Sequence, residues 1–313
     1  MRALVVSNMY PSPGSPARGS FVRDQVQALR RISGIELDLF AFEGGTPAAY
    51  MRAAIGLRRT VAGKRFDIVH AHFGLTAWPA LAAPGAARVL TLHGTDLSHP
   101  RSRAITLAAL RAYDLVATVS EPLARLVPSW ASGGEVAVLP CGVDTHRFRP
   151  IPRAQARSEL GLDEHGPQLL FPADPARSEK RYDLARAVAG ELPLHVLRGV
   201  PPEQVPLWVN AANAVLVPSD REGFGLATLE ALACDVPVLA TPVGVAPDVL
   251  PGIAGTYCGP FELEAWRSAL APLLAAPDPR VAGRSRAELF SADRMANRVL
   301  SAWRALVEDE PPA

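Results

Sequence analysis

Lysine is nearly missing from this chain of 313 residues. Of its 32 basic residues only Lys64 and Lys180 are lysines, and the other thirty are arginines. A lysine at a chemically suggestive position is therefore harder to attribute to chance here than in an average protein. A strong excess of one charge is missing as well: 31 acidic residues nearly balance the basic ones, and no basic run forms a nucleic-acid footprint. We therefore expect no nucleic-acid partner.

Cysteine is scarce, and long hydrophobic runs are absent. Cys141, Cys234 and Cys258 are an odd, widely spaced set without a C-x-x-C pair, which indicates small buried thiols in a reducing compartment. No stretch reaches the roughly 18 apolar residues that a membrane-spanning helix needs. The first apolar run is also far shorter than the core of a signal peptide. We therefore expect a cytoplasmic protein.

The chain does contain enough apolar material for two cores. Apolar residues make up 49% of it and charged residues 20%, which is a globular composition. The length exceeds the usual size of one core, so we expect two domains.

Short runs rich in Val, Ile and Leu alternate with helical patterns in the first half. The expected strands are Ala3–Ser7, Ile35–Phe40, Ile68–His72, Val89–His93, Leu115–Ser120 and Val136–Pro140, and the expected helices are Phe21–Ile32, Tyr50–Ala62 and Ala104–Tyr113. Near-continuous apolar strands that alternate with helices predict a parallel sheet with helices on both faces. Such a domain is a doubly wound α/β fold.

A connector rich in proline follows near residue 150, and a second series of strands begins beyond it. These strands are Leu169–Ala173, Leu194–Arg198, Ala214–Ser219 and Val236–Thr241. We predict an N-terminal domain over residues 1–150, a C-terminal domain over 151–290, and a C-terminal helix within 291–313 that packs back toward the first domain. Because parallel sheets bind ligands beyond the carboxyl ends of their strands, we expect the two domains to face each other across a cleft.

Histidines end two neighbouring strands of the first domain. His72 ends one of them, and His93, followed by a glycine turn and Asp96, ends the next. A histidine at this edge can donate a hydrogen bond to a sugar hydroxyl or a phosphate. His70 and His72 could equally be structural histidines with satisfied partners, whereas the turn and the acid after His93 favour a functional role.

Two further segments follow strands and could contact phosphate. The first, around Gly19, resembles a P-loop only superficially because it lacks the lysine, and a plain strand-to-helix turn explains it nearly as well. The second contains Arg177 and Lys180, whose charges could neutralise a diphosphate. A solvated charge run is the ordinary alternative, but the rarity of lysine favours a function.

The clearest signal is residues 221–230, Arg-Glu-Gly-Phe-Gly-Leu-Ala-Thr-Leu-Glu, where Glu222 and Glu230 flank a glycine turn that opens a helix. The N-terminus of a helix carries unpaired N–H groups and a partial positive charge, which suit a phosphate. The two carboxylates are then left for the hydroxyls of a sugar. A pair of acids could also be the catalytic pair of a glycosidase, but the doubly wound fold and the basic residues favour phosphate chemistry.

Residues 222–244 resemble the E-x7-E signature of the retaining glycosyltransferases of family 4, whose GT-B fold consists of two Rossmann-like domains facing an interdomain cleft. Further segments resemble the family in the same order along the chain: residues 67–72, 91–96, 118–120, 138–150 and 210–219. The resemblance covers nearly the whole chain and is specific for the family but not for the substrate.

The resemblance implies a role for each matched residue. Glu222 would contact hydroxyls of the donor sugar, Glu230 the nucleotide ribose, and Lys180 with Arg177 the diphosphate. The remaining donor-binding residues would be Gly19 and the main chain of Gly223, Phe224, Gly225 and Leu226. His93, Lys180 and Glu222 are the expected catalytic residues, and His72 and Asp96 are expected on the acceptor side.

The chain departs from the family pattern in the phosphate loop. Arg177 lies only three residues before Lys180, and Arg181 occupies the position of the usual glycine. Whether Arg177 or Arg181 is the second diphosphate ligand therefore stays open. Cys141 also replaces the asparagine that usually precedes Gly142.

The function implied is that of a retaining hexosyltransferase, which needs neither a divalent metal nor a cofactor because the nucleotide sugar is a substrate. A UDP-sugar is the first choice of donor and GDP-mannose the second, with a saccharide, a lipid-linked molecule or a small molecule as acceptor. A nucleotide-sugar epimerase and a non-catalytic nucleotide-sugar-binding protein are the alternatives. The arginine-bearing helix at residues 50–62 could contact the inner face of a membrane, although a solvated helix is the favoured interpretation.

Overall fold

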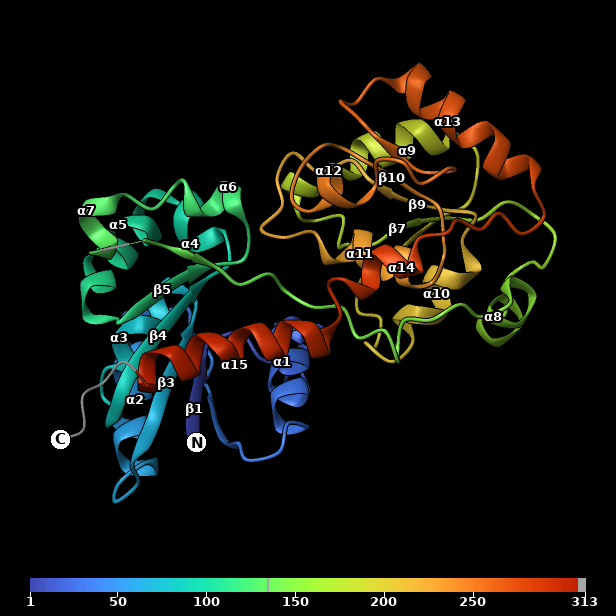
Figure 1. The fold of residues 1–313 in the computed structure, drawn as a ribbon. Helices are drawn as coiled ribbons and strands as arrows, with labels where there is room; N and C mark the ends of the chain where they lie inside the picture. The colour runs from blue at the N-terminus through green and yellow to red at the C-terminus, as the bar shows by residue number, and fades with distance from the viewer. Residues whose placement is uncertain (134, 309–313) are drawn as a thin grey trace. The chain divides into compact units, whose positions relative to one another are not determined.

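The computed structural model describes residues 1–133 and 135–308, which form two compact units (Figure 1). The N-terminal unit consists of Met1–Gly142 and the C-terminal segment from Ala292, and the C-terminal unit is Val143–Ser291. The sequence placed the boundary near Pro150, whereas contacts in the structure divide the chain directly after Gly142.

The N-terminal unit is a six-stranded parallel sheet flanked by helices. Its elements are β1 (Arg2–Ser7), α1 (Ser20–Arg30), β2 (Glu36–Ala41), α2 (Pro47–Thr60), β3 (Phe66–His72), η1 (Gly74–Thr76), α3 (Ala77–Ala80), β4 (Gly85–Leu92), α4 (Thr95–Ser98), α5 (Pro100–Ala109), η2 (Leu110–Ala112), β5 (Leu115–Thr118), α6 (Glu121–Ala124), α7 (Ser129–Ser132), β6 (Ala137–Val138) and α15 (Ala292–Glu308). The strand order is β2-β1-β3-β4-β5-β6.

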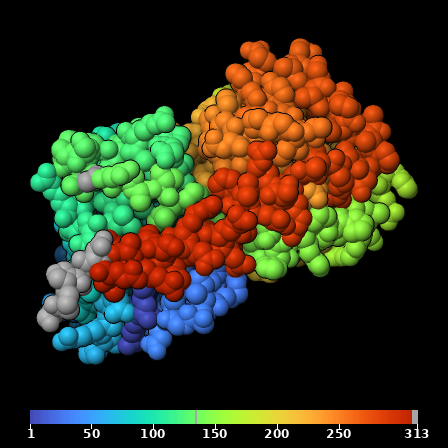
Figure 2. Space-filling view, viewed as in Figure 1, coloured from blue at the N-terminus to red at the C-terminus, as the bar shows by residue number. Residues whose placement is uncertain are grey.

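Helix α15 completes the core of this unit although it comes from the far end of the chain. Its apolar stripe, which includes Met295, Val299 and Trp303, is buried against Ile68 and Val89 of the sheet. The helix also packs beside α1, and its red atoms run across the visible surface of the unit (Figure 2). The spacing of these apolar residues follows the helical period of 3.6, so the amphipathic pattern explains the docking.

The C-terminal unit is a five-stranded parallel sheet of order β11-β10-β9-β7-β8. Its elements are α8 (Arg153–Leu160), β7 (Leu169–Phe171), η3 (Ser178–Lys180), α9 (Tyr182–Ala189), β8 (Leu194–Val196), α10 (Val205–Ala211), β9 (Ala214–Val217), α11 (Leu226–Ala233), β10 (Val238–Ala240), α12 (Ala246–Val249), β11 (Tyr257–Cys258), α13 (Leu263–Ala275) and α14 (Arg284–Glu288). Trp266 of α13 is fully buried against Leu169, Leu216 and Leu239 of the sheet. The two sheets confirm the predicted class of doubly wound α/β domains.

Strand order reverses once in each sheet, and these reversals determine where ligand sites can form. In the N-terminal unit the chain moves from β1 to β2 on one side and continues with β3 on the other. In the C-terminal unit β7 lies between β8 and β9 in the same way. Because crossover connections leave a crevice beyond the carboxyl ends of such strands, loops that follow β1, β3, β7 and β9 are the expected sites of binding.

Candidate functional site

Lys180 and Glu222 form the centre of the polar cluster in the C-terminal unit. Lys180 lies in the segment after β7 and Glu222 in the loop after β9, so they meet at the reversal of strand order. The Lys180 Nζ donates to both carboxylate oxygens of Glu222, at 2.7 and 2.6 Å, and the side chains are only 14% and 10% exposed. Ser219 Oγ donates to Oε1 of the same carboxylate at 2.8 Å. The pair is shielded from water, where a charge-assisted hydrogen bond is strong.

The helix α11 begins directly after this pair. Its N-cap is Gly225 in the left-handed region, no side chain caps the helix, and the first turn contains no acid. The partial positive charge of the helix N-terminus is therefore not neutralised by a carboxylate of its own first turn. Lys180 and the start of α11 together make this corner of the unit attractive to an anion.

Gly244, which follows β10, fixes the shape of the loop that carries Glu222. Its backbone has φ of 61°, and an added Cβ would lie 2.5 Å from the carbonyl oxygen of Phe224 and 2.7 Å from the Cβ of Glu222. Val245 N donates to that same carbonyl oxygen at 2.7 Å. Only glycine allows the two loops to come this close.

Glu230 and Phe224, both predicted to bind the donor, have different surroundings. Glu230 is partly exposed and shares one side of α11 with Leu226, one helical turn earlier, because residues i and i+4 lie on the same face. Phe224 is 6% exposed and its ring packs against Phe290, so its side chain belongs to the core and only its main chain is available to a ligand.

The two arginines predicted to contact the diphosphate are held by carboxylates. Arg177 pairs with Glu179 at 2.7 Å, and its side chain is 56% exposed. Arg181 donates to Asp183 and Asp220, whose hydrogen bonds raise the pKa of Arg181 above its usual range. Arg181 also has a left-handed backbone with φ of 56°, a conformation that glycine adopts more easily than arginine.

In the N-terminal unit, a chain of hydrogen bonds ends at His93. Gln25 of α1 donates through Nε2 to Nε2 of His72 at 3.3 Å, and Nδ1 of His72 lies 3.0 Å from Nε2 of His93. The ring of His93 packs against Phe21 and Phe73, with centroid separations of 4.8 and 4.6 Å. His93 is partly exposed, whereas His72 is fully buried. The chain therefore leads from a buried amide to the surface.

This chain also determines which ring nitrogens hold protons. Burial lowers the pKa of His72 to about 3, and burial together with His72 holds the pKa of His93 well below its ordinary value, so both rings are neutral. Because Nε2 of His72 accepts from Gln25, its proton lies on Nδ1 and is donated to Nε2 of His93. The proton of His93 must then lie on Nδ1, which makes that nitrogen a neutral hydrogen-bond donor.

The buried acid Asp96 supports the turn at His93. Its carboxylate accepts the backbone N–H groups of His93, Gly94 and Gly74. Burial raises the pKa of Asp96, although these N–H groups favour its charged form. Asp96 is 4% exposed, so both residues expected on the acceptor side, His72 and Asp96, lie beneath the surface and act on His93.

Gly19 is the N-cap of α1 and lies close to the turn after β1. Its backbone is left-handed with φ of 66°, and a Cβ there would collide with the carbonyl oxygen of Met9. The helix N-terminus has neither a side-chain cap nor an acid in its first turn. The close approach of the Met9 backbone therefore requires glycine here, and a contact between Gly19 and a phosphate stays a prediction.

Sequence reasoning assigned no role to three residues that the structure places in these clusters, Gln25, Ser219 and Gly244. Ser219 and Gly244 lie two and four residues beyond the ends of β9 and β10, so their position after a strand was a usable signal. Gln25 is one polar residue among several on α1, and nothing in its local sequence indicates that it reaches His72.

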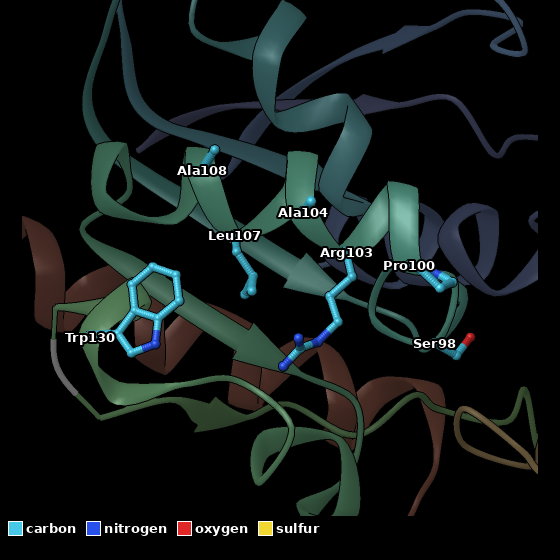
Figure 3. Close-up of a pocket in the computed structure, with 7 residues that line it drawn as sticks. All are labelled: Ser98, Pro100, Arg103, Ala104, Leu107, Ala108 and Trp130. Carbon is cyan, nitrogen blue, oxygen red and sulfur yellow. The ribbon is translucent and has the colours of Figure 1, made fainter.

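A separate cavity of about 570 Å³ lies between α5 and α7 of the N-terminal unit (Figure 3). Leu107, Ala104 and the ring of Trp130 line it, and Arg103 reaches along it from α5. None of the predicted site residues lines this cavity. It is therefore distinct from the clusters around His93 and Lys180.

Comparison with known proteins gives consistent matches. Residues 19–147 match the family described as Glycosyltransferase Family 4, and residues 166–288 match Glycosyl transferases group 1. A D-inositol 3-phosphate glycosyltransferase of Actinosynnema mirum is 30% identical over 95% of this chain and 85% of that protein. A protein of the same name from Segniliparus rotundus is 30% identical over 77% of this chain and 66% of its own length.

A GDP-mannose-dependent alpha-(1-6)-phosphatidylinositol monomannoside mannosyltransferase of Mycolicibacterium smegmatis is also 30% identical, over 71% of this chain and 72% of that protein. Among solved structures, sucrose-phosphate synthase of Thermosynechococcus elongatus aligns with a TM-score of 0.73 at 20% identity, covering 99% of this chain and 100% of that one. Alr3699/HepE of Anabaena, in complex with UDP and glucose, gives 0.71 at 14% identity, with 97% and 100% covered. These two likenesses show the fold.

Proposed function

The chain belongs to glycosyltransferase family 4 and has the GT-B fold, and from this we propose that it transfers a sugar from a nucleotide diphosphate sugar to an acceptor hydroxyl with retention of configuration. One observation carries the proposal: Lys180 and Glu222 meet at the reversal of strand order, beside the uncapped N-terminus of α11. This corner offers a cation, helix N–H groups and a carboxylate to a ligand that is anionic at one end and hydroxylated at the other.

Departure of the diphosphate is the step that this corner would assist. The bond between the anomeric carbon and the diphosphate oxygen breaks, so negative charge grows on the leaving group while the sugar carbon becomes positive. Lys180 has three N–H donors, of which Glu222 needs at most two, so one remains for a phosphate oxygen. Groups that are already oriented toward the growing charge stabilise the transition state without reorganisation.

Glu222 would act both on the sugar and on Lys180. Its two oxygens already accept from Lys180 and Ser219, so the carboxylate holds the ammonium group in place and has capacity for one further hydroxyl donor. These hydrogen bonds also make Glu222 a poor nucleophile. This favours a same-face mechanism, in which the acceptor oxygen attacks the sugar carbon and its proton passes to the departing phosphate oxygen.

His93 would donate a hydrogen bond from Nδ1 to the donor sugar. Its ring would stay neutral and would neither give a proton to the substrates nor take one from them. Arg177 is the better choice for the second diphosphate ligand because it has one carboxylate partner, whereas Arg181 has two. Protein cations would then supply the positive charge, so we propose that neither a divalent metal nor a cofactor takes part.

The proposal extends to the donor and the acceptor. We propose a UDP-sugar first and GDP-mannose second; a relative of M. smegmatis is named as GDP-mannose-dependent. The names of the relatives point to inositol phosphates and phosphatidylinositol mannosides as acceptors, alongside saccharides. The two acceptors named for the relatives share a phosphorylated inositol.

The proposal is tested by incubating the protein with a panel of nucleotide sugars and following nucleotide release by chromatography, with and without acceptors, in the presence and absence of a metal chelator. We expect acceptor-dependent release that the chelator leaves unchanged. Isomerised donor without acceptor would instead establish an epimerase, and binding without turnover a non-catalytic protein.

Replacing the paired residues tests the site itself. Lys180→Ala or Glu222→Ala should each lower transfer at least ~100-fold, the scale of losing one preorganised contact. Lys64→Ala is the matched control, because Lys64, the other lysine of the chain, pairs with Asp38 away from this cluster. If both site variants turned over at nearly the normal rate, the assignment would be wrong.

A further inference from the structure

The helices α2, α3, α5 and α7 of the N-terminal unit form one continuous surface. They pack against one another in that order, on the side of the sheet away from α1 and α15. Trp78 of α3 donates through Nε1 to the carbonyl oxygen of Ile105 of α5 at 3.2 Å. Arg111 of η2 donates to the carbonyl oxygen of Trp130 of α7 at 2.7 Å. We call the surface of α2, α3, α5, η2 and α7 the basic face.

The charge of the basic face has a single sign. None of its five elements contains Asp or Glu, and together they contain six arginines: Arg52, Arg58, Arg59, Arg101, Arg103 and Arg111. Its nearest acidic neighbours along the chain are Asp114, whose carboxylate accepts the Arg88 N–H, the exposed Glu135 after α7, the exposed Glu43 before α2 and the buried Asp96 before α5. This local excess is notable because basic and acidic residues balance in the chain as a whole, at 32 and 31.

Large apolar side chains project from the same surface. Of those that are exposed among the described residues, all but Leu289 lie on or beside the basic face: Met51 at 64%, Ile55 at 48%, Trp78 at 45%, Ile105 at 47%, Leu126 at 47% and Trp130 at 63%. Soluble proteins rarely gather exposed apolar groups in one region unless something covers them. The open cavity between α5 and α7 adds space lined by Leu107 and Trp130 (Figure 3).

From this combination we propose that the basic face docks on a bilayer containing anionic lipids. Arginines attract the negative surface of such a bilayer, and tryptophans are favoured at the boundary between head groups and hydrocarbon. Met51, Ile55 and Ile105 would enter the acyl boundary, as the apolar side of an interfacial surface does. A nucleic acid would match the arginines but would leave the aliphatic side chains uncovered.

This proposal is independent of the proposed function, because lipid binding is measured without any sugar transfer. The purified full chain is mixed with vesicles of phosphatidylcholine alone or with phosphatidylglycerol added, and the bound fraction is measured by flotation. We expect binding to the anionic vesicles, weakening as salt is raised, and little binding to the neutral ones.

Two variants separate the charge from the apolar contribution. Arg58→Glu with Arg59→Glu should weaken binding by roughly 30-fold or more, since each basic residue near an anionic surface contributes about a factor of five. Met51→Ser with Trp130→Ser should weaken vesicle binding at low salt and at high salt. Arg149→Glu with Arg304→Glu is the matched control, because both arginines are exposed and lie outside the basic face while the change in net charge is the same.

Three results would overturn the proposal. The first is an absence of binding to anionic vesicles. The second is binding that the control pair reduces as much as the Arg58 and Arg59 pair does. The third is tighter retention of the chain by single-stranded nucleic acid than by the vesicles, which would assign the basic face to a different partner.

Discussion

Several of the chemically suggestive residues in this protein act by holding another residue in place. Glu222 fixes the ammonium group of Lys180, and Asp96 gathers the backbone N–H groups of the turn at His93. His72 fixes the ring of His93 in the same sense. A carboxylate or imidazole in such a position contributes orientation, so its replacement should alter geometry before it alters the charge presented to a ligand.

Gln25→Glu should reverse the proton positions along the chain that leads to His93. A carboxylate can only accept, so Nε2 of His72 would become the donor, Nδ1 would accept from His93, and Nδ1 of His93 would lose its proton. ¹⁵N NMR of the histidine rings would show the exchanged tautomers, and transfer should fall about tenfold or more if Nδ1 donates to the sugar. Gln27→Glu is the control on the exposed side of the same helix, and unchanged ring spectra in Gln25→Glu would refute the proposed chain.

Between elements, close contacts between loops determine the shape of the site in the C-terminal unit. The loop after β10 touches the loop after β9 at a distance that excludes any side chain on Gly244. The start of α11, the Glu222 carboxylate and Gly244 are therefore one arrangement, and its parts cannot move separately.

Gly244→Ala should displace the loop that carries Glu222 and disturb its pairing with Lys180. We expect a large loss of transfer, together with a loss of unfolding free energy of about 1–3 kcal/mol from the left-handed backbone. Gly252→Ala is the matched control because its φ is 82° and an added Cβ meets nothing within 4 Å. Equal loss of transfer in the two variants would mean that backbone strain, and not the collision, causes the defect.

For the molecule as a whole, the cluster of His70, His72 and His93 makes stability depend on pH. Burial holds the pKa of His72 at about 3, and the pKa values of His70 and His93 are also well below 6.5, first because of burial and then because of the neighbouring histidines. Below pH 6.5 these histidines bind protons in the unfolded chain but stay neutral in the folded protein. Stability is therefore complete above this pH and falls as the pH decreases.

Each of these three histidines should reduce the free energy of unfolding by about 1.4 kcal/mol per pH unit below 6.5. Urea unfolding at pH 7.5 and pH 5.0 would measure the total change. His72→Gln should make the dependence shallower, whereas replacing the exposed His165 by glutamine should not. A protein equally stable at both pH values would show that these rings are not buried in the neutral state.

The sequence by itself determined the class of fold, the family and the residues at the strand ends, because apolar periodicity and glycine turns are local properties that a single segment reveals. His93, Lys180 and Glu222 were predicted in this way. Their partners were decided by tertiary structure. Lys180 and Glu222 are 42 positions apart, and Gln25 and His72 are 47 apart, so the order of strands in each sheet brings them together.

Tertiary structure also decided which residues are buried and which residues lie together on one surface. His72 and Asp96 are as polar as His93 in the sequence, yet only the packing of α1, β3 and β4 buries them. The six arginines of the basic face are spread over sixty positions, from Arg52 to Arg111, and form one surface because successive crossovers place their helices on one side of the sheet. Crossover direction is a property of the whole sheet, and no single segment encodes it.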